Sequence, residues 1–225
     1  MLEREPVSKR STAVRRAVFV DRDGVINRMF HHPEFGILDS PANPDQFELL
    51  PGVGEAIAEL NSLGLLVIVA SNQPGIAKGK LTAALLEAIE QKMMAGIEAA
   101  GGTLDDVYYC LHHPDAILEK YRVLCECRKP APGLLLKAAL EWNIELTGSY
   151  MIGDGVSDIA AGRAAGATTL FVNARKCYNC EALADHAAWP NYLVGDLREA
   201  AAVIRKIECG DFESVETFAL KCATQ

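Results

Sequence analysis

The stretch Ala17-Val-Phe-Val-Asp-Arg-Asp-Gly-Val-Ile-Asn27 decides the fold, because it joins a short apolar strand to two carboxylates two residues apart. In an extended chain, this spacing places both carboxylates on the same face. Asp21 could then attack an electrophile while Asp23 exchanges protons with the leaving group. Gly24 would let the chain turn away from the strand.

Two alternatives apply to this segment taken alone. A calcium loop of the EF-hand kind also begins Asp-x-Asp, but it requires glycine at its sixth position and glutamate at its twelfth. Here those positions hold Ile26 and His32, which disfavours such a loop. The second alternative is a solvated acidic turn, and only the rest of the chain can decide against it.

Short apolar runs alternate with helical patterns along the rest of the chain. This alternation is typical of βαβ units and predicts an α/β fold with a doubly wound, mainly parallel sheet. The expected strands are 17–20, 65–70, 107–110, 150–152, 168–172 and 192–194. The expected helices are 52–63, 82–100, 132–142, 158–165 and 196–206, and in the second of these Leu85, Ile89, Met93 and Ile97 share one face.

Composition narrows the class of protein. The 225 residues carry a net charge of -8, which disfavours a nucleic-acid partner because such binding depends on Lys and Arg. The longest apolar runs are too short to cross a membrane, and the start lacks the apolar core of a signal peptide, so we expect a cytoplasmic protein. We expect a flexible extension at 1–16, one domain at 17–209 and a tail at 210–225.

Polar residues at the ends of other expected strands extend the candidate site. Ser71 and Asn72 could hydrogen-bond phosphate oxygens, although Ser-Asn-Gln-Pro-Gly is equally an ordinary turn. Lys129, preceded by Arg128, could neutralise charge on a transferring phosphoryl group, whereas the alternative is a surface basic pair. Asp154, after the expected strand 150–152, is a further candidate residue of this site.

A magnesium ion needs few hard oxygen ligands from a protein. Asp154, Asp21 and a backbone carbonyl would therefore suffice. Asp158, four residues further on, is expected to cap a helix or to contact a ligand rather than the metal.

A second metal site is expected in the long loop 111–129. Cys110, His112, Cys125 and Cys127 offer four soft ligands in two close pairs, which suits a tetrahedral structural Zn²⁺ site. His113 is an alternative ligand to His112. The remaining alternatives are unrelated thiols beside a surface His-His pair or, less favoured in a chain without an export signal, a disulfide.

The chain resembles the haloacid dehalogenase (HAD) superfamily of phosphatases over residues 17–175. The resemblance lies in four motifs that occur in the same order, each at a strand end or a helix start: Asp-x-Asp, Ser, Lys and Gly-Asp-x-x-x-Asp. The resemblance implies a Mg²⁺-dependent phosphatase with Asp21 as nucleophile and Asp23 as general acid and base. It also implies that Ser71 and Lys129 stabilise the phosphoryl group. The implied Mg²⁺ ligands are Asp21, the backbone carbonyl of Asp23, and Asp154.

The zinc loop narrows the resemblance. The chain is similar to the D-glycero-D-manno-heptose 1,7-bisphosphate phosphatase branch of this superfamily, which is close to the histidinol-phosphatases. The similarity lies in Cys-x-His followed after a long loop by Cys-x-Cys-Arg-Lys-Pro, and in the motifs Asp-Arg-Asp-Gly-Val-Ile-Asn and Ser-Asn-Gln-x-Gly-Ile-Ala-x-Gly. This implies a small sugar bisphosphate as substrate, in the synthesis of lipopolysaccharide precursors. It also implies that Arg128 recognises the substrate and that Asn72 lies beside the phosphate.

The chain departs from the usual pattern of that branch after Asn27, where the segment 28–36 is longer than expected. We expect the loop 27–51 to contact the sugar. The short insertions leave little room for a large cap domain, so the site should be open.

Other readings remain. A histidinol-phosphatase would use the same catalytic residues. The acidic net charge disfavours a nucleic-acid 3′-phosphatase. The complete set of catalytic residues disfavours a non-catalytic, zinc-stabilised binding protein. Cys177 and Cys180 have the spacing of metal ligands or of a redox pair, but two cysteines alone do not complete a zinc site. We therefore expect them, with Cys209 and Cys222, to be buried or free thiols, and we expect His186 to be ordinary packing.

Overall fold

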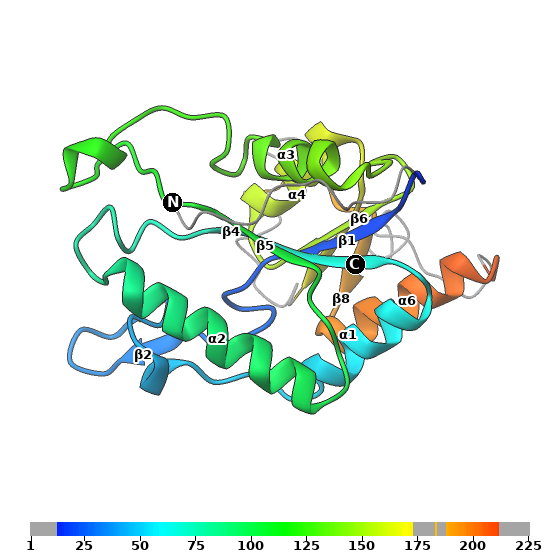
Figure 1. Ribbon diagram of the computed structural model, residues 1–225, viewed down its shortest axis with the longest axis horizontal. Helices are drawn as coiled ribbons and strands as arrows, with labels where there is room; N and C mark the ends of the chain where they lie inside the picture. The colour runs from blue at the N-terminus through cyan, green and yellow to red at the C-terminus, as the bar shows by residue number, and fades with distance from the viewer. Residues whose placement is uncertain (1–12, 173–182, 184–187, 212–225) are drawn as a thin grey trace.

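The centre of the protein is a six-stranded parallel sheet. The computed structural model describes residues 13–172, 183 and 188–211 (Figure 1). The strand order is β5-β4-β1-β6-β7-β8, and every neighbouring pair is parallel. The strands are β1 Ala17–Val20, β4 Leu66–Asn72, β5 Asp106–Cys110, β6 Tyr150–Gly153, β7 Thr168–Val172 and β8 Tyr192–Val194. All six predicted strands are therefore confirmed, and the predicted α/β class with them.

Helices cover both faces of this sheet, which explains why its strands are apolar on both sides. The helices are α1 Val53–Ser62, α2 Ala83–Ala99, α3 Gly133–Trp142, α4 Val156–Ala165 and α6 Leu197–Glu208. Val18 and Val20 of β1 point into the core beneath α1, α2 and α6, whereas Ala17 and Phe19 point into the core beneath α3. Figure 1 shows these two layers on opposite sides of the strands.

The buried face of α2 differs by one residue from the prediction. Leu86, not Leu85, begins the fully buried stripe that continues through Ile89, Met93 and Ile97. A strict four-residue spacing drifts by about 40° per step around a helix with 3.6 residues per turn. The three-residue step from Leu86 to Ile89 removes part of this drift, and the longer stripe can face the sheet.

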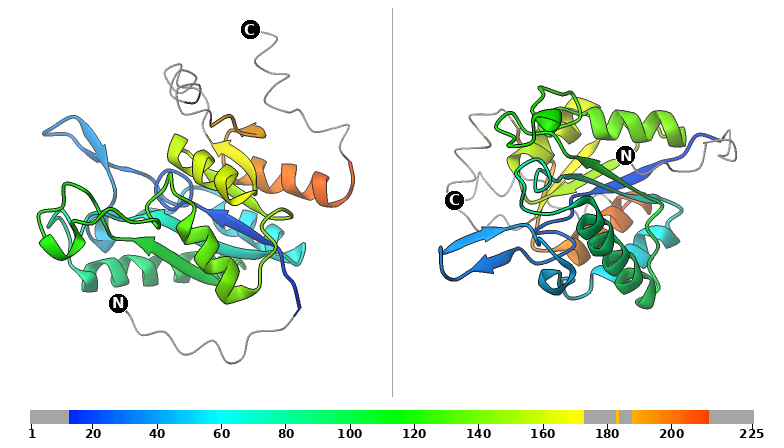
Figure 2. Two further views of the ribbon diagram at one scale, coloured as in Figure 1. Left: turned by 90° about the horizontal axis from the view of Figure 1, so that it is seen from above. Right: turned by 60° about the vertical axis from the view of Figure 1, so that its left-hand side comes forward.

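The loop 27–51 contains secondary structure that the sequence did not predict. Strands β2 Phe30–His32 and β3 Ile37–Asp39 form an antiparallel hairpin, and the 3₁₀ helix η1 Pro44–Gln46 follows. The strands escaped prediction because each has three residues and neither has a buried face. The hairpin projects from the same end of the molecule as the loop 111–129, which contains the 3₁₀ helix η2 Glu119–Tyr121 (Figures 1 and 2).

Neither insertion forms a hydrophobic core of its own among the described residues, in agreement with the expected lack of a large cap domain. Among the described helices, none combines the length and apolarity needed to cross a bilayer. Most of the predicted extension and tail lies outside the described residues, as do Cys177, Cys180, His186 and Cys222. The predicted division into domains stays a prediction.

Candidate active site

The candidate catalytic residues meet at one edge of the sheet. Strands β4, β1 and β6 are neighbours, and because they are parallel their carboxyl ends point the same way. Asp21 follows β1, Ser71 lies near the end of β4, and Asp154 follows β6. The chain order of the motifs thus becomes a cluster in space.

Lys129 enters this cluster from the segment just before α3 and is almost fully buried. Its ammonium lies 2.9 Å from Asp21 Oδ1 and 2.5 Å from Asp158 Oδ1, and it donates a hydrogen bond to the Ala70 carbonyl at 2.7 Å. Burial by itself lowers the pKa of Lys129, but Asp158 and Asp21 more than offset this effect and hold the pKa above its ordinary value. Lys129 is therefore a fixed positive charge beside Asp21.

Asn72 holds the backbone of Lys129 in place. Its Oδ1 accepts from the Lys129 N–H at 3.1 Å, and its Nδ2 donates to the Lys129 carbonyl at 3.0 Å. The carboxamide that we expected beside the phosphate is therefore engaged by a neighbouring backbone in this structure.

Asp158 caps a helix, which is one of the two roles expected for it, and it also pairs with Lys129, which the sequence did not indicate. Its Oδ2 accepts from the Gly155 N–H at 2.9 Å at the start of α4. Burial raises the pKa of Asp158 to about 6; Lys129 opposes this shift and the nearby Asp21 adds to it. Gly153 leaves room for this side chain, because a Cβ there would lie 2.2 Å from the Asp158 Cβ.

The carboxylates of Asp21, Asp154 and Asp158 form a group that suits a magnesium ion. One oxygen from each lies within 4.8 Å of the other two. Oδ1 of Asp21 is buried without a hydrogen bond, apart from its ion pair with Lys129. Hard oxygen donors of this kind are the ligands that Mg²⁺ prefers. The residues therefore fit the metal expected from the sequence.

Gly24 allows the Asp-x-Asp turn to approach Asp154. Its φ is +87°, in the left-handed region, and a Cβ at this position would lie 2.2 Å from Asp154 Oδ2. Glycine is thus required for two separate reasons: backbone conformation and close contact.

The side chain of Asp23 points into a buried polar network that sequence reasoning missed. Arg22, Gln73 and Asn27 all donate hydrogen bonds to its carboxylate, and all three are buried. A signal was present in the sequence for two of them, since Arg22 and Gln73 are polar residues that closely follow the apolar strands β1 and β4. Nothing in the sequence indicated that the three meet at one carboxylate.

The four candidate zinc ligands gather as expected. The sulfur atoms of Cys110, Cys125 and Cys127 lie 3.3 to 3.7 Å apart, and His112 Nδ1 lies 3.3 Å from Cys127 Sγ and 3.9 Å from Cys110 Sγ. Two sulfurs bound tetrahedrally to one zinc at about 2.3 Å would be about 3.8 Å apart. The three thiols are free, and the cluster fits a zinc site.

The cluster stands next to the catalytic edge. Arg128, the residue after Cys127, donates to the His112 carbonyl at 3.2 Å, and Lys129 follows directly. The neighbouring His113 accepts from the Asp115 N–H and is outside the cluster. Cys209 lies apart from this site, exposed after α6.

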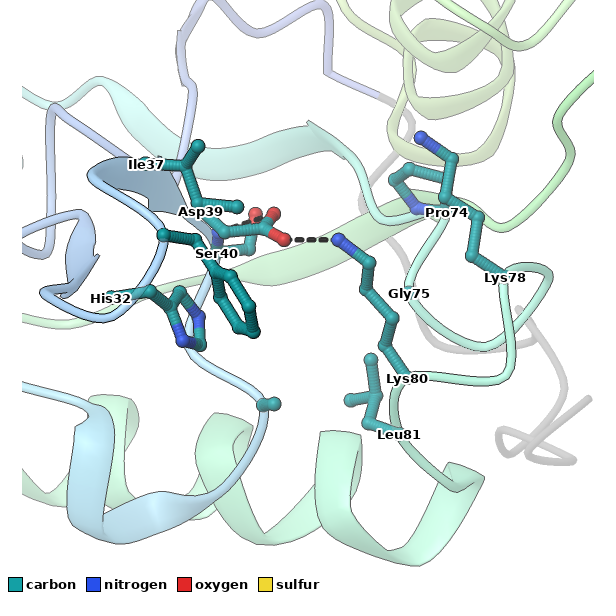
Figure 3. Close-up of a pocket in the computed structure, with 11 residues that line it drawn as sticks. His32, Ile37, Asp39, Ser40, Pro74, Gly75, Lys78, Lys80 and Leu81 are labelled. Atoms are coloured by element: carbon teal, nitrogen blue, oxygen red, sulfur yellow. Dashed lines mark hydrogen bonds and ion pairs between the residues drawn. The ribbon is translucent and has the colours of Figure 1, made fainter.

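A pocket of about 340 Å³ lies between the β2–β3 hairpin and the loop after β4. Its lining is His32, Phe35, Ile37, Asp39, Ser40, Ala42, Pro74, Gly75, Lys78, Lys80 and Leu81. An ion pair between Asp39 and Lys80 joins the two walls (Figure 3). Because Pro74 directly follows Gln73, the pocket adjoins the Asp23 network.

Comparisons with known proteins agree with this geometry. A family model described as HAD-hydrolase-like matches residues 126–200. The D-glycero-β-D-manno-heptose-1,7-bisphosphate 7-phosphatase of Salmonella typhi is 36% identical over 191 residues, which cover 84% of this chain and 95% of that protein. The protein of the same name from Escherichia coli K12 is 38% identical over 185 residues, covering 82% and 92%.

Solved structures place the chain in the same group. The D,D-heptose 1,7-bisphosphate phosphatase of B. bronchiseptica, solved with magnesium and phosphate, superposes with a TM-score of 0.69 at 31% identity, covering 85% of this chain and 99% of that one. A putative HAD-like phosphatase from Mesorhizobium loti gives 0.63 at 30% identity, covering 71% and 73%. The chain therefore belongs to the HAD phosphatase family, in the branch of the D-glycero-β-D-manno-heptose-1,7-bisphosphate 7-phosphatases.

Proposed function

We propose that this protein is a Mg²⁺-dependent phosphatase that converts D-glycero-D-manno-heptose 1,7-bisphosphate to the 1-phosphate through an aspartyl-phosphate on Asp21. The observation that carries the proposal is the buried ion pair between Lys129 and Asp21 at the carboxyl edge of the sheet. The relatives named above support the substrate. The proposal includes the cytoplasmic location and the lack of a nucleic-acid partner expected from the sequence.

The proposed reaction has two steps, formation of the aspartyl-phosphate and its hydrolysis. Asp21 attacks phosphorus while Asp23 protonates the departing sugar alkoxide, and Asp23 then takes a proton from the water that hydrolyses the aspartyl-phosphate. Ser71 donates a hydrogen bond to the phosphoryl group, and the positive charge of Lys129 lowers the repulsion between two anions. Asp21, Asp154 and the Asp23 carbonyl would hold Mg²⁺, whose charge stabilises the phosphoryl oxygens when bound.

The zinc loop supports this chemistry indirectly. Cys110, His112, Cys125 and Cys127 would hold a structural Zn²⁺, which ties the loop 111–129 to the end of β5. Arg128 is thereby presented to the substrate. The pocket beside the hairpin supplies Lys78 and Lys80 near the same edge, and it would receive the part of the substrate beyond the scissile phosphate.

The test is phosphate release by the purified protein, with and without Mg²⁺, from heptose 1,7-bisphosphate, histidinol phosphate and a panel of other sugar phosphates. Preference for the heptose bisphosphate that is lost in Asp21→Asn supports both mechanism and substrate. Activity on a different ester, still lost in Asp21→Asn, keeps the mechanism and refutes the substrate. No activity on any ester by a folded, metal-loaded protein refutes the proposal.

A further inference from the structure

The carboxylate of Asp23 is held from two sides by buried donors. Arg22 Nε and Asn27 Nδ2 donate to Oδ1 at 3.1 and 3.0 Å, and Gln73 Nε2 donates to Oδ2 at 2.6 Å. Arg22 Nη2 contacts both oxygens at 3.1 Å. The side chain that must move protons in both steps of the reaction therefore has a defined rotation and position.

Gln73 is the only member of this network that also reaches the phosphate-binding strand. Its Nε2 donates both to Asp23 and to Ser71 Oγ, the latter at 3.1 Å, while its Oε1 accepts from Arg22 Nη2 at 2.8 Å. Because Arg22 can only donate, the orientation of the carboxamide is unambiguous. Both of its N–H groups and its oxygen are engaged.

No other side chain of this length can make the same contacts. A glutamate offers no N–H group, a leucine offers neither donor nor acceptor, and an asparagine is shorter by one methylene. Gln73 is 2% exposed, so water cannot readily replace a contact that is lost. Arg22 is 0% exposed, and its charge depends on the oxygens of Asp23 and Gln73 for compensation.

We propose that Gln73 is a positioning residue for Asp23, and that the buried chain Ser71–Gln73–Asp23, anchored by Arg22, aligns the proton-transfer group with the phosphate-binding end of β4. This inference rests on the proposed function, because it assigns Gln73 to the reaction of Asp23. Its consequence is that loss of Gln73 impairs proton transfer more than binding.

The first experiment compares two leaving groups. In Gln73→Leu, we expect kcat for heptose 1,7-bisphosphate to fall by about 10- to 100-fold, with KM within about threefold, since misplacing a catalytic group reduces rate rather than affinity. With p-nitrophenyl phosphate, whose leaving group needs no proton, the first turnover should keep its wild-type rate. The second step still needs Asp23 as base, so a burst of one p-nitrophenolate per enzyme should precede a slow steady state.

The second experiment uses Gln73→Glu, which keeps the size of the side chain. Only a protonated glutamate can donate to Asp23 while accepting from Arg22. We therefore expect the ratio of Gln73→Glu activity to wild-type activity to rise as the pH is lowered, whereas the ratio for Gln73→Leu stays flat. A merely structural role would not produce this difference.

Controls separate the possible failures. Gln91→Leu makes the same chemical change on the exposed side of α2 and should leave activity and melting temperature unchanged. Asp21→Asn, added to Gln73→Leu, should abolish the burst of p-nitrophenolate. If wild type hydrolyses neither ester, the proposed function fails. If wild type is active, any of three results overturns the inference on Gln73. Gln73→Leu could keep the wild-type kcat, or it could lose first-turnover rate equally on both esters. The third result is that Gln73→Glu shows no pH-dependent recovery.

Discussion

Replacing Gly24 with alanine should separate metal binding from folding. A Cβ at this position would lie 2.2 Å from Asp154 Oδ2, whereas real Cβ atoms essentially never make a non-bonded contact shorter than 3.0 Å, so the carboxylate has to move by about 0.8 Å. A shift of about 1 Å in a reacting group can cost about 100-fold in rate. We expect Gly24→Ala to lose about 100-fold in kcat and to need at least tenfold more Mg²⁺ for half-maximal activity.

The same substitution also strains the backbone. With φ at +87°, alanine costs about 1–2 kcal/mol, which lowers the melting temperature of a chain of this size by about 2–8 °C. Gly64→Ala is the matched control, because its φ is +76° and a Cβ there meets nothing within 4 Å. It lies between α1 and β4, at the opposite edge of the sheet.

The assay measures phosphate release against Mg²⁺ concentration, together with thermal unfolding, for both variants. We expect similar losses of melting temperature but a loss of activity and of Mg²⁺ affinity in Gly24→Ala alone. If Gly24→Ala retains the wild-type kcat and Mg²⁺ dependence, then Asp154 does not hold the metal as the geometry indicates, and the assignment is wrong.

Three further predictions concern other parts of the molecule. Cys125→Ser should remove bound zinc, measured by metal analysis, and lower both stability and activity, whereas Cys209→Ser, which changes an exposed thiol, should do neither. Lys129→Met should abolish detectable turnover and cost about 3–5 kcal/mol at pH 7, because Asp21 and Asp158 then face each other without a cation. Burial already raises the pKa of Asp158, so this deficit, measured by urea unfolding without metal, should shrink as the pH falls and Asp158 gains a proton. A deficit independent of pH would contradict the account. In a double-mutant cycle, the effects of Tyr150→Phe and Glu208→Gln on the free energy of unfolding should be coupled by about 1 kcal/mol. The reason is that the Tyr150 phenol donates a hydrogen bond to the Glu208 carboxylate at 2.7 Å. Additive losses would show that this contact contributes nothing.

The candidate metal-binding and nucleophilic residues could be found from the sequence because their positions follow from local pattern. Each strand is an apolar run, and alternation with helices makes the sheet parallel. Parallel strands bring their carboxyl ends to one edge, so Asp21, Ser71 and Asp154 had to meet there. The candidate zinc ligands were equally accessible, since the two members of each pair are separated by a single residue and one pair directly precedes Arg128 and Lys129.

The contacts around Asp23 could not be found in this way. Gln73 lies 50 residues from Asp23 in the chain, and its carboxamide contacts depend on side-chain direction at the end of β4. Likewise, the pairing of Asp158 with Lys129 depends on how α3 and α4 pack. Periodicity reports which face of an element is buried, but it carries no information on which buried polar groups meet.

The sequence by itself therefore determined the α/β fold, the candidate catalytic edge of the sheet and the membership of the candidate zinc cluster, because each follows from local spacing and from the geometry of parallel strands. Only the tertiary structure decided the β2–β3 hairpin and its pocket, the engagement of Asn72 by the Lys129 backbone, and the network that holds Asp23. The hairpin could not be predicted because its three-residue strands have no buried face. The other features arise from hydrogen bonds and ion pairs between distant residues, whose strength depends on burial and on distances of a few ångströms.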